Sequence, residues 1–540
     1  MKRLFFLSWP SWRRIGQAAF LIAFLVLFRR TETTGADTLP GGENFFFRID
    51  PLVAAAACLA GRTLVALFWP SLILLGLSLV FGRFFCGWVC PLGTLLDALQ
   101  FIVRPLSRLT TRWSRSEQGA AVLKEVRLSR YVLLALCLIG ALLAFPLVGL
   151  FDPFALLTRG LAFWADPKFY DSADAALTWV GHGGNDSVHK FFVKHVMPFR
   201  ANLYDLAAVS AAILGVLFLL EFVARRFWCR YLCPLGAVYG LVARVAFIRR
   251  LPAKVCGNCG ECAADCRMGA LDKAAGVSPE ECNVCMDCVA LCPKGIPKFA
   301  PPARRPALPA PLDLSKRRLF AAIAAGTAVP ALAHAQKWTL GTVIVEGLLR
   351  PPGAGDEKKF LGLCVRCGLC MKVCPTNVLQ PAILQNGIEG LFAPHLAPRA
   401  IFEQSYCEYN CNLCGQVCPS GAIPRLSIDE KHKAAIGKAY FDHNRCLPWA
   451  KDTSCIRCEE VCPLPEKAIT VLNTFHIKDA KGEQIEIQQP AVDRDKCVGC
   501  GICESNCPLE GAAGIRVVRV DAIDPKTEFR LGMPLMGKKQ

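Results

Sequence analysis

The sequence lacks several signatures by which redox proteins bind organic cofactors. None of its Cys-x-x-Cys motifs is followed by histidine, which excludes covalently attached c-type haem. No glycine-rich dinucleotide fingerprint precedes a helix. Only eight histidines occur among 540 residues, and none lies within a long apolar run. A haem held by two histidines between apolar segments is therefore not expected.

Composition excludes further classes. Hydrophobic residues make up 53% of the chain and the mean hydropathy is +0.35, which is too apolar for a disordered protein and high for a soluble one. The length of 540 residues excludes a small disulfide scaffold and predicts several domains. The net charge of +18 would suit a nucleic-acid binder, but the position of the basic residues beside apolar runs indicates a lipid bilayer instead.

Cysteine is abundant, with 30 residues in the chain. Most of them form six quartets, four with the spacing C-x2-C-x2-C-x3-C and two with a wider first gap. The quartets are Cys256, Cys259, Cys262 and Cys266; Cys282, Cys285, Cys288 and Cys292; Cys364, Cys367, Cys370 and Cys374; Cys407, Cys411, Cys414 and Cys418; Cys446, Cys455, Cys458 and Cys462; and Cys497, Cys500, Cys503 and Cys507.

This spacing predicts six [4Fe–4S] clusters. Three thiolates two residues apart can hold three corners of a cubane, while the fourth cysteine is expected to open a helix and to ligate the cluster of a partner quartet. A proline follows the fourth cysteine in five quartets, which suits a helix start. Structural zinc is the alternative, but zinc sites usually come as two separated Cys-x2-Cys knuckles and not as one compact quartet. Cys266 and Cys292 are expected to exchange clusters, whereas the pairing of the last four quartets stays open.

The first 253 residues are predicted to be a membrane domain. Four apolar runs, about Ile15–Phe28, Cys58–Phe81, Tyr131–Leu150 and Asn202–Val223, approach the ~20 residues that cross a bilayer. Lysine and arginine concentrate before the first run, in the loop 83–130 and after the fourth run. The positive-inside rule therefore places the N-terminus in the cytoplasm and the loop 151–201 outside.

An internal repeat lies inside this domain. The segment 83–93 (RFFCGWVCPLG) matches the segment 226–236 (RFWCRYLCPLG). Duplicated hairpins would bring both copies together, so that Cys86, Cys90, Cys229 and Cys233 could hold one further metal centre. A pair of redox-active or merely structural thiols is the alternative.

The joint between the two halves carries a proline-rich stretch and then a signal-like segment. Residues 297–311 contain six prolines, which predicts a stiff, extended linker. Arg317, Arg318 and Phe320 precede a mild apolar run, in the pattern of a twin-arginine export signal placed inside the chain; an ordinary amphipathic anchor is the alternative. Either segment would carry the chain outward.

These features divide the chain into five parts: a membrane domain (1–253), a cytoplasmic two-cluster module (254–298), a linker (299–315), a signal or anchor (316–336) and a periplasmic four-cluster domain (337–540). The expected fold class is an α-helical membrane bundle with small α+β ferredoxin-like domains. Alternation in Ile515–Val520 predicts a short strand that closes the last of them.

Two known families share these motifs. Residues 1–300 resemble NapH/MauN-type membrane proteins, with four spans, two Cys-x3-Cys-Pro motifs and a two-cluster module. Residues 313–520 resemble NapG/MauM-type periplasmic ferredoxins in the signal, in the stretch 349–353 (LRPPG) and in the quartet that begins at Cys364. Here the two are one chain. One departure is Arg267, which stands where the other quartets have proline.

The resemblance implies a quinol dehydrogenase of anaerobic respiration in the bacterial inner membrane. Quinol from the membrane quinone pool would give up two electrons, and the clusters would pass them to a periplasmic c-type cytochrome or a terminal reductase. The membrane cysteines would form a redox centre or gate, and Arg366 and Arg457 could raise cluster potentials.

Several roles stay open. The outer loop carries His182, His189 and His195, either in a solvated loop or as acceptors of quinol protons. A maturation factor for a metalloenzyme, and a conduit from cytoplasmic ferredoxin to the periplasm, are the alternative functions. The sequence identifies no catalytic residue and no quinol pocket.

Overall fold

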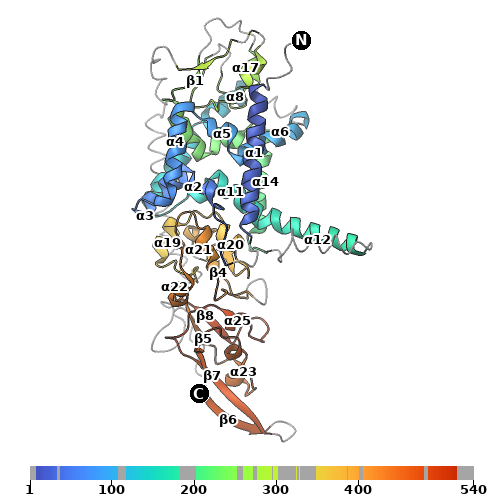
Figure 1. Ribbon diagram of the computed structural model, residues 1–540, viewed down its shortest axis with the longest axis vertical. Helices are drawn as coiled ribbons and strands as arrows, with labels where there is room; N and C mark the ends of the chain where they lie inside the picture. Colours follow the sequence, from blue (N-terminus) through green and yellow to red (C-terminus); the bar gives the residue numbers. More distant parts are fainter. Residues whose placement is uncertain are drawn as a thin grey trace.

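The computed structural model is elongated, with a helical half in the middle and cysteine-rich lobes at both ends (Figure 1). It describes residues 8–519 except 33–36, 107–116, 183–201, 252–259, 272–275, 293, 295, 302–323, 325–326, 329–347, 386, 400–404 and 479–483. Several predictions fall outside the described residues, among them those for Cys256, Cys259, His189, His195 and most of the linker and signal.

The helical half contains many short elements around one long helix. Its elements are α1 (Trp9–Arg30), α2 (Phe45–Arg48), α3 (Pro51–Gly61), η1 (Ala66–Phe68), α4 (Trp69–Phe81), α5 (Phe84–Trp88), α6 (Pro91–Leu106), α8 (Glu117–Val126), α9 (Ser129–Leu142), α10 (Val148–Phe151), α11 (Pro153–Gly160), η2 (Leu161–Ala165), α12 (Asp166–His182), α14 (Ala207–Leu219), η3 (Leu220–Phe222), η4 (Trp228–Leu232) and α15 (Pro234–Ala243). The side chains of Asp50 and Asp152 cap α3 and α11, each just before a proline.

Two of the four predicted spans are wrong in their bounds. The run Cys58–Phe81 is broken, because α3 ends at Gly61 and Arg62 takes a left-handed φ of 50°. The run Tyr131–Leu150 is broken in the same way, because α9 ends at Leu142 and Ala144 has a φ of 57°. Hydropathy averages over such interruptions, so continuous spans were predicted where the chain turns.

The four-span bundle is consequently not confirmed. Among the described residues one helix, α1, is long and apolar enough to cross a membrane, and it contains the predicted run Ile15–Phe28. The other apolar helices have 10–17 residues. They pack on one another rather than standing alone, since α9 contacts both α3 and α15, and α11 contacts α14.

The lobe beside α5 and α6 is small. It contains β1 (Arg249–Arg250), α16 (Glu261–Ala264), α17 (Asp287–Leu291) and β2 (Phe299–Ala300), and β1 pairs antiparallel with β2. With so little regular structure, the lobe depends on whatever its cysteines bind.

The opposite end holds two stacked lobes (Figure 1). The nearer lobe comprises α19 (Glu357–Leu363), α20 (Leu369–Lys372), β3 (Leu379–Pro381), η5 (Ile388–Gly390), β4 (Pro394–Leu396), α21 (Leu413–Val417) and α22 (Ile428–Lys433). The farther lobe comprises β5 (Lys438–Phe441), α23 (Leu447–Ala450), α24 (Arg457–Glu460), β6 (Ile469–Lys478), β7 (Gln484–Val492), α25 (Ile502–Ser505) and β8 (Ile515–Val518). Strand β8 pairs with β5, so the strand predicted near Ile515–Val520 is confirmed.

The helices of the cysteine lobes correct one expectation. In every quartet the third cysteine lies in a helix of four or five residues, in α16, α17, α20, α21, α24 and α25. The fourth cysteine follows that helix instead of opening one; Cys292 and Cys418, for example, are C-cap residues. The proline after the fourth cysteine therefore prevents the helix from continuing, rather than starting one.

A buried histidine in the nearer lobe gives a pH prediction. His395 in β4 is buried, and burial together with the positive charge of Arg350 lowers its pKa to about 4. Below the unfolded pKa of about 6.5 the unfolded chain takes up a proton that the folded chain does not, so stability falls with acidification between pH 6.5 and 4, by about 3 kcal/mol in total. His395→Gln should remove this part of the acid sensitivity, measured as the pH dependence of thermal cluster loss. The matched variant at exposed His443 should keep it.

Candidate metal centres

The cysteines of the two outer lobes gather in four sets, each made from two quartets. Three cavities are lined by complete sets: Cys364, Cys367, Cys370 and Cys418; Cys374, Cys407, Cys411 and Cys414; and Cys462, Cys497, Cys500 and Cys503. The remaining set is Cys446, Cys455, Cys458 and Cys507, whose thiols interact electrostatically. Consecutive quartets thus exchange their fourth cysteine, which settles the pairing that the sequence left open.

The inner lobe follows the same pattern as far as it is described. Cys266 lies with Cys282, Cys285 and Cys288 around one cavity, as the predicted exchange requires. The reciprocal set would join Cys292 to Cys256, Cys259 and Cys262. Of these, Cys262 also lines this cavity, and Cys256 and Cys259 fall outside the described residues.

These sets have the chemistry that a thiolate-bound cluster needs. Burial raises the pKa of the Cys407 thiol to about 12 and that of Cys500 to about 11, so both stay protonated at neutral pH until a metal displaces the proton. Backbone N–H groups also point at sulfur: that of Ala439 donates to Cys497 Sγ at 3.4 Å, and that of Gly514 to Cys507 Sγ at 3.3 Å. Such donors stabilise the negative charge of a reduced cluster.

The repeated motif brings four more cysteines together inside the helical half. Cys86, Cys90, Cys229 and Cys233 are all buried and are electrostatic neighbours of one another. Cys90 and Cys233 directly precede the prolines that open α6 and α15. Here, unlike in the lobes, proline does start a helix.

Two buried arginines link the two copies of the repeat. Arg83 of the first copy donates through Nη2 to the carbonyl oxygen of Cys229, and Arg226 of the second donates through Nη1 to that of Cys86, each at 2.8 Å. A Cβ atom at Gly236 would lie 2.4 Å from Arg83 Nη2, so the glycine that ends the motif makes room for the arginine of the other copy. The motif is therefore a reciprocal clamp, and its two cations lie beside the four thiols.

An ionic network joins this clamp to the inner lobe. Arg226 Nη2 lies 2.7 Å from Asp97 Oδ2, and Arg267 Nη1 lies 2.8 Å from the same oxygen. Arg267 Nε also donates to Asp287 at 2.5 Å, next to Cys288. The arginine that replaces the expected proline thus connects a cluster lobe to the helical half.

The helical half is in close contact with cysteine loops on both sides. A Cβ atom at Gly87 would lie 2.3 Å from the carbonyl oxygen of Asn283, in the loop after Cys282. On the other side, a Cβ atom at Gly149 would lie 2.2 Å from the carbonyl oxygen of Val365, in the loop after Cys364. Only glycine allows either approach.

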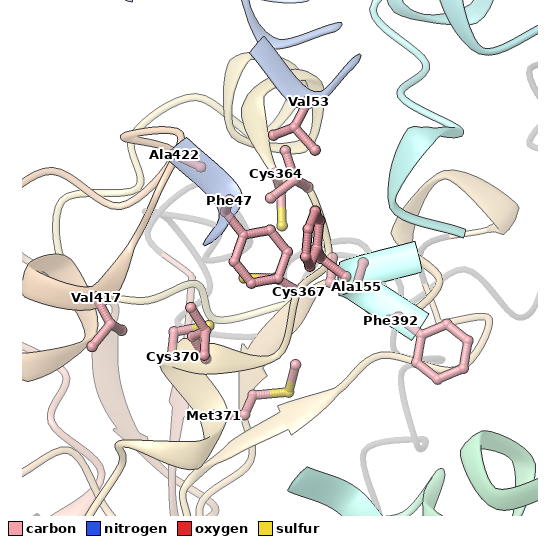
Figure 2. Close-up of a cluster of buried hydrophobic side chains, with 14 of the residues drawn as sticks. Phe47, Val53, Ala155, Cys364, Cys367, Cys370, Met371, Phe392, Val417 and Ala422 are labelled. Carbon is pink, nitrogen blue, oxygen red and sulfur yellow. The ribbon is translucent and has the colours of Figure 1, made fainter. Parts of the chain in front are cut away.

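Figure 2 shows the second of these junctions, with Phe47, Val53 and Ala155 of the helical half packed around Cys364 and Cys367. The apolar core is continuous across the junction, so the nearer outer lobe is seated directly on the helical half.

A cubane offers one iron to each of four cysteines, which matches the number of cysteines in each set. Within the described residues, no group of three or more His, Cys, Asp or Glu side chains is placed to hold one metal ion.

Sequence reasoning placed some charged residues well and missed others. Arg366 is buried and interacts electrostatically with Cys364, whereas the half-exposed Arg457 pairs with Glu460 on the surface; the effect of either on a cluster potential stays a prediction. Arg83 and Arg226 were visible as repeated residues, but their crossed contacts require the fold.

Family models match the same segments. A model described as a 4Fe-4S binding domain matches residues 63–109 and 206–252, one match for each copy of the repeat. A 4Fe-4S dicluster domain matches residues 363–422, and a further 4Fe-4S binding domain matches residues 489–514. These domains define an iron–sulfur electron-transfer protein of the ferredoxin type.

Curated relatives narrow the family. The methylamine utilization ferredoxin-type protein MauM of Methylorubrum extorquens is 40% identical over 172 residues, which are 32% of this chain and 72% of the relative. The ferredoxin-type protein NapG of Escherichia coli is 36% identical over 167 residues, 31% of this chain and 68% of the relative. The chain belongs to this MauM/NapG family of ferredoxin-type proteins, fused here to further parts. No solved structure matches it.

Proposed function

We propose that the protein oxidises quinol at the bacterial inner membrane and passes the electrons to a periplasmic c-type cytochrome or terminal reductase. In this proposal each of the six cysteine sets holds one [4Fe–4S] cluster, which supplies one-electron transfer. The observation that carries the proposal is the seating of the nearer outer lobe on an apolar helical half. A quinol-binding segment and a series of cluster sites are thereby joined in one molecule.

The contacts define an order for the outer sites. The site with Cys418 shares its lobe with the site that contains Cys407, and the backbone N–H of Cys407 donates to the carbonyl oxygen of Cys500 at 2.8 Å. The site at Cys500 shares the farther lobe with the site of Cys446. Electrons that enter beside the helical half can therefore leave from the farther lobe.

The topology is part of the proposal. The N-terminus and the lobe of α17 lie in the cytoplasm, and the lobes of α19 to β8 lie in the periplasm, beyond an internal signal or anchor at 316–336. The basic residues that precede α1 support this orientation.

Anaerobic purification with iron and sulfide counting tests the cluster assignment, followed by EPR after addition of a quinol analogue. Six clusters require about 24 iron atoms per chain, and a seventh at Cys86, Cys90, Cys229 and Cys233, here called the membrane thiols, raises the number to about 28. If quinol reduced no cluster in a fully loaded protein, the proposed function would be wrong.

A second function is favoured by one specific observation, the close approaches at Gly87 and Gly149. They bring the helical half into contact with the inner lobe on one side and with the nearer outer lobe on the other, so electrons could also pass from a cytoplasmic ferredoxin outward. The two functions separate in Cys229→Ser, which would interrupt transfer from reduced ferredoxin to the outer acceptor. Quinol oxidation in the same variant would continue if quinol delivers its electrons directly to the outer lobes.

A further inference from the structure

A polar cavity lies where the outer end of α1 meets the nearer outer lobe. Part of it is open to solvent. It is lined by charged and polar side chains (Glu32, Asp166, Tyr170, Asn202, Tyr204 and Lys372) and by Ala162, Pro167, Cys374 and Pro375.

Two carboxylates share the cavity with a buried cation. Lys372 Nζ lies 2.9 Å from Glu32 Oε1 and 2.6 Å from Asp166 Oδ2. Arg29 Nη1 contacts both carboxylates, at 2.9 and 2.8 Å. The Lys372 side chain is 3% exposed, whereas those of Glu32 and Asp166 are 19% and 13% exposed. The carboxylates are thus fixed by two cations yet within reach of water, and their remaining lone pairs can accept further protons.

The wall of the cavity also carries an unused hydrogen-bonding group. The hydroxyl of Tyr204 is buried without a hydrogen-bond partner of ordinary geometry, although the residue is 6% exposed and lines the cavity. It faces the side chain of Asn202, whose amide already donates to the carbonyl oxygens of Lys372 and Cys374. The ring of Tyr204 packs on Phe163 with centroids 4.5 Å apart, so a phenol-sized ring would meet aromatic surface here.

The cavity is next to a cluster site. Cys374 and Pro375 line it, and the same two residues line the site of Cys407, Cys411 and Cys414. Cys374 and Pro375 therefore lie between a molecule in the cavity and that cluster site.

The surroundings of the cavity fit the outer surface of a membrane. Helix α12 begins at Asp166 and extends sideways from the long axis of the molecule (Figure 1). Trp164, Phe169 and Trp179 on and beside this helix are 46%, 53% and 80% exposed. Exposed aromatic side chains of this kind are typical of the membrane–water interface. A ring with an apolar tail could therefore enter from the lipid.

We propose that this cavity binds the quinol ring, with Glu32 and Asp166 as acceptors of its two hydroxyl protons and the cluster beside Cys374 as the first electron acceptor. This inference rests on the proposed function. One quinol and two oxidised [4Fe–4S]²⁺ clusters give one quinone, two [4Fe–4S]⁺ clusters and two protons. The protons leave through the exposed edges of the carboxylates to the outer solvent, and the electrons continue singly to the farther lobe.

The double variant Glu32→Gln/Asp166→Asn of the full chain tests the proposal. Removal of a general base typically costs 10²–10⁴-fold, so we expect quinol oxidation to fall by about 100-fold or more. Reduction of the clusters by dithionite, and their EPR signals, should be unchanged. The matched control is Asp171→Asn on the exposed face of α12, which should oxidise quinol at the parent rate. A double variant with the parent rate would overturn the site.

Photolabelling of the unmodified protein with an azidoquinone gives a second measurement that needs neither turnover nor a folded variant. Label in peptides 162–170 or 372–375 supports the site, and label confined to other peptides overturns it. If the double variant lost its clusters, the labelling result would decide. A parent protein whose clusters quinol never reduces would instead refute the proposed function, so the two failures can be told apart.

Discussion

Cys414→Ala is expected to stop electron delivery to the outer acceptor, down to the rate measured without protein. Cys414 belongs to the set with Cys374, Cys407 and Cys411, and it lies in α21 between two buried apolar residues. This site is next to the proposed quinol cavity, and it meets the farther lobe through the hydrogen bond from Cys407 to Cys500. Both proposed routes, from quinol and from the cytoplasm, would pass through it.

The iron content provides the quantitative test of this variant. We expect a loss of about four iron atoms per chain, one cubane, with the other clusters retained. Cys58→Ala is the matched control, because Cys58 lies in α3 outside every cysteine set and should leave both iron content and rate unchanged. A Cys414 variant that loses four irons but keeps the parent rate would show that electrons bypass this site.

The sequence predicted the cysteine chemistry of the site well because cluster ligation is local. Three cysteines of each set come from one short loop, so their spacing alone identifies them. The fourth comes from the neighbouring quartet along the chain, as with Cys418 in the set of Cys364 and Cys507 in the set of Cys446. That exchange depends on how two loops pack, which spacing does not encode.

The helical half was harder to predict for a physical reason. Hydropathy reports how apolar a segment is, but it does not report where the backbone turns. Arg62 and Ala144 take left-handed conformations, which are unusual for residues with a side chain, and each interrupts an apolar run. The proposed quinol cavity was equally invisible, because Glu32, Asp166 and Lys372 are far apart in the chain and no motif connects them.

Arg226→Met is expected to destabilise the junction of the two repeat copies by about 3–5 kcal/mol, as is typical when one partner of a buried ion pair is removed. The Arg226 side chain is 1% exposed, and its Nε and Nη2 donate to Asp97 at 2.9 and 2.7 Å. Its other contacts are with the carbonyl oxygens of Cys86 and Gly93. Without Arg226, fewer positive charges neutralise the Asp97 carboxylate. The hydrogen bond from Arg226 to the carbonyl oxygen of Cys86, which is one half of the clamp, is lost as well.

Arg225→Met is the matched control, since the neighbouring arginine is 30% exposed and pairs with Asp265 at the surface. Exposed pairs contribute at most about 1 kcal/mol, so its thermal midpoint for cluster loss should stay near that of the parent. The thermal midpoint of Arg226→Lys should lie between those of Arg226→Met and Arg225→Met, because lysine keeps the charge but cannot make the paired contact with a carboxylate. If Arg226→Met also lost about four irons while the clusters of the inner and outer lobes stayed intact, Cys86, Cys90, Cys229 and Cys233 would hold a cluster. If its stability and iron content matched those of Arg225→Met, the crossed arginines would not be what holds the two copies together.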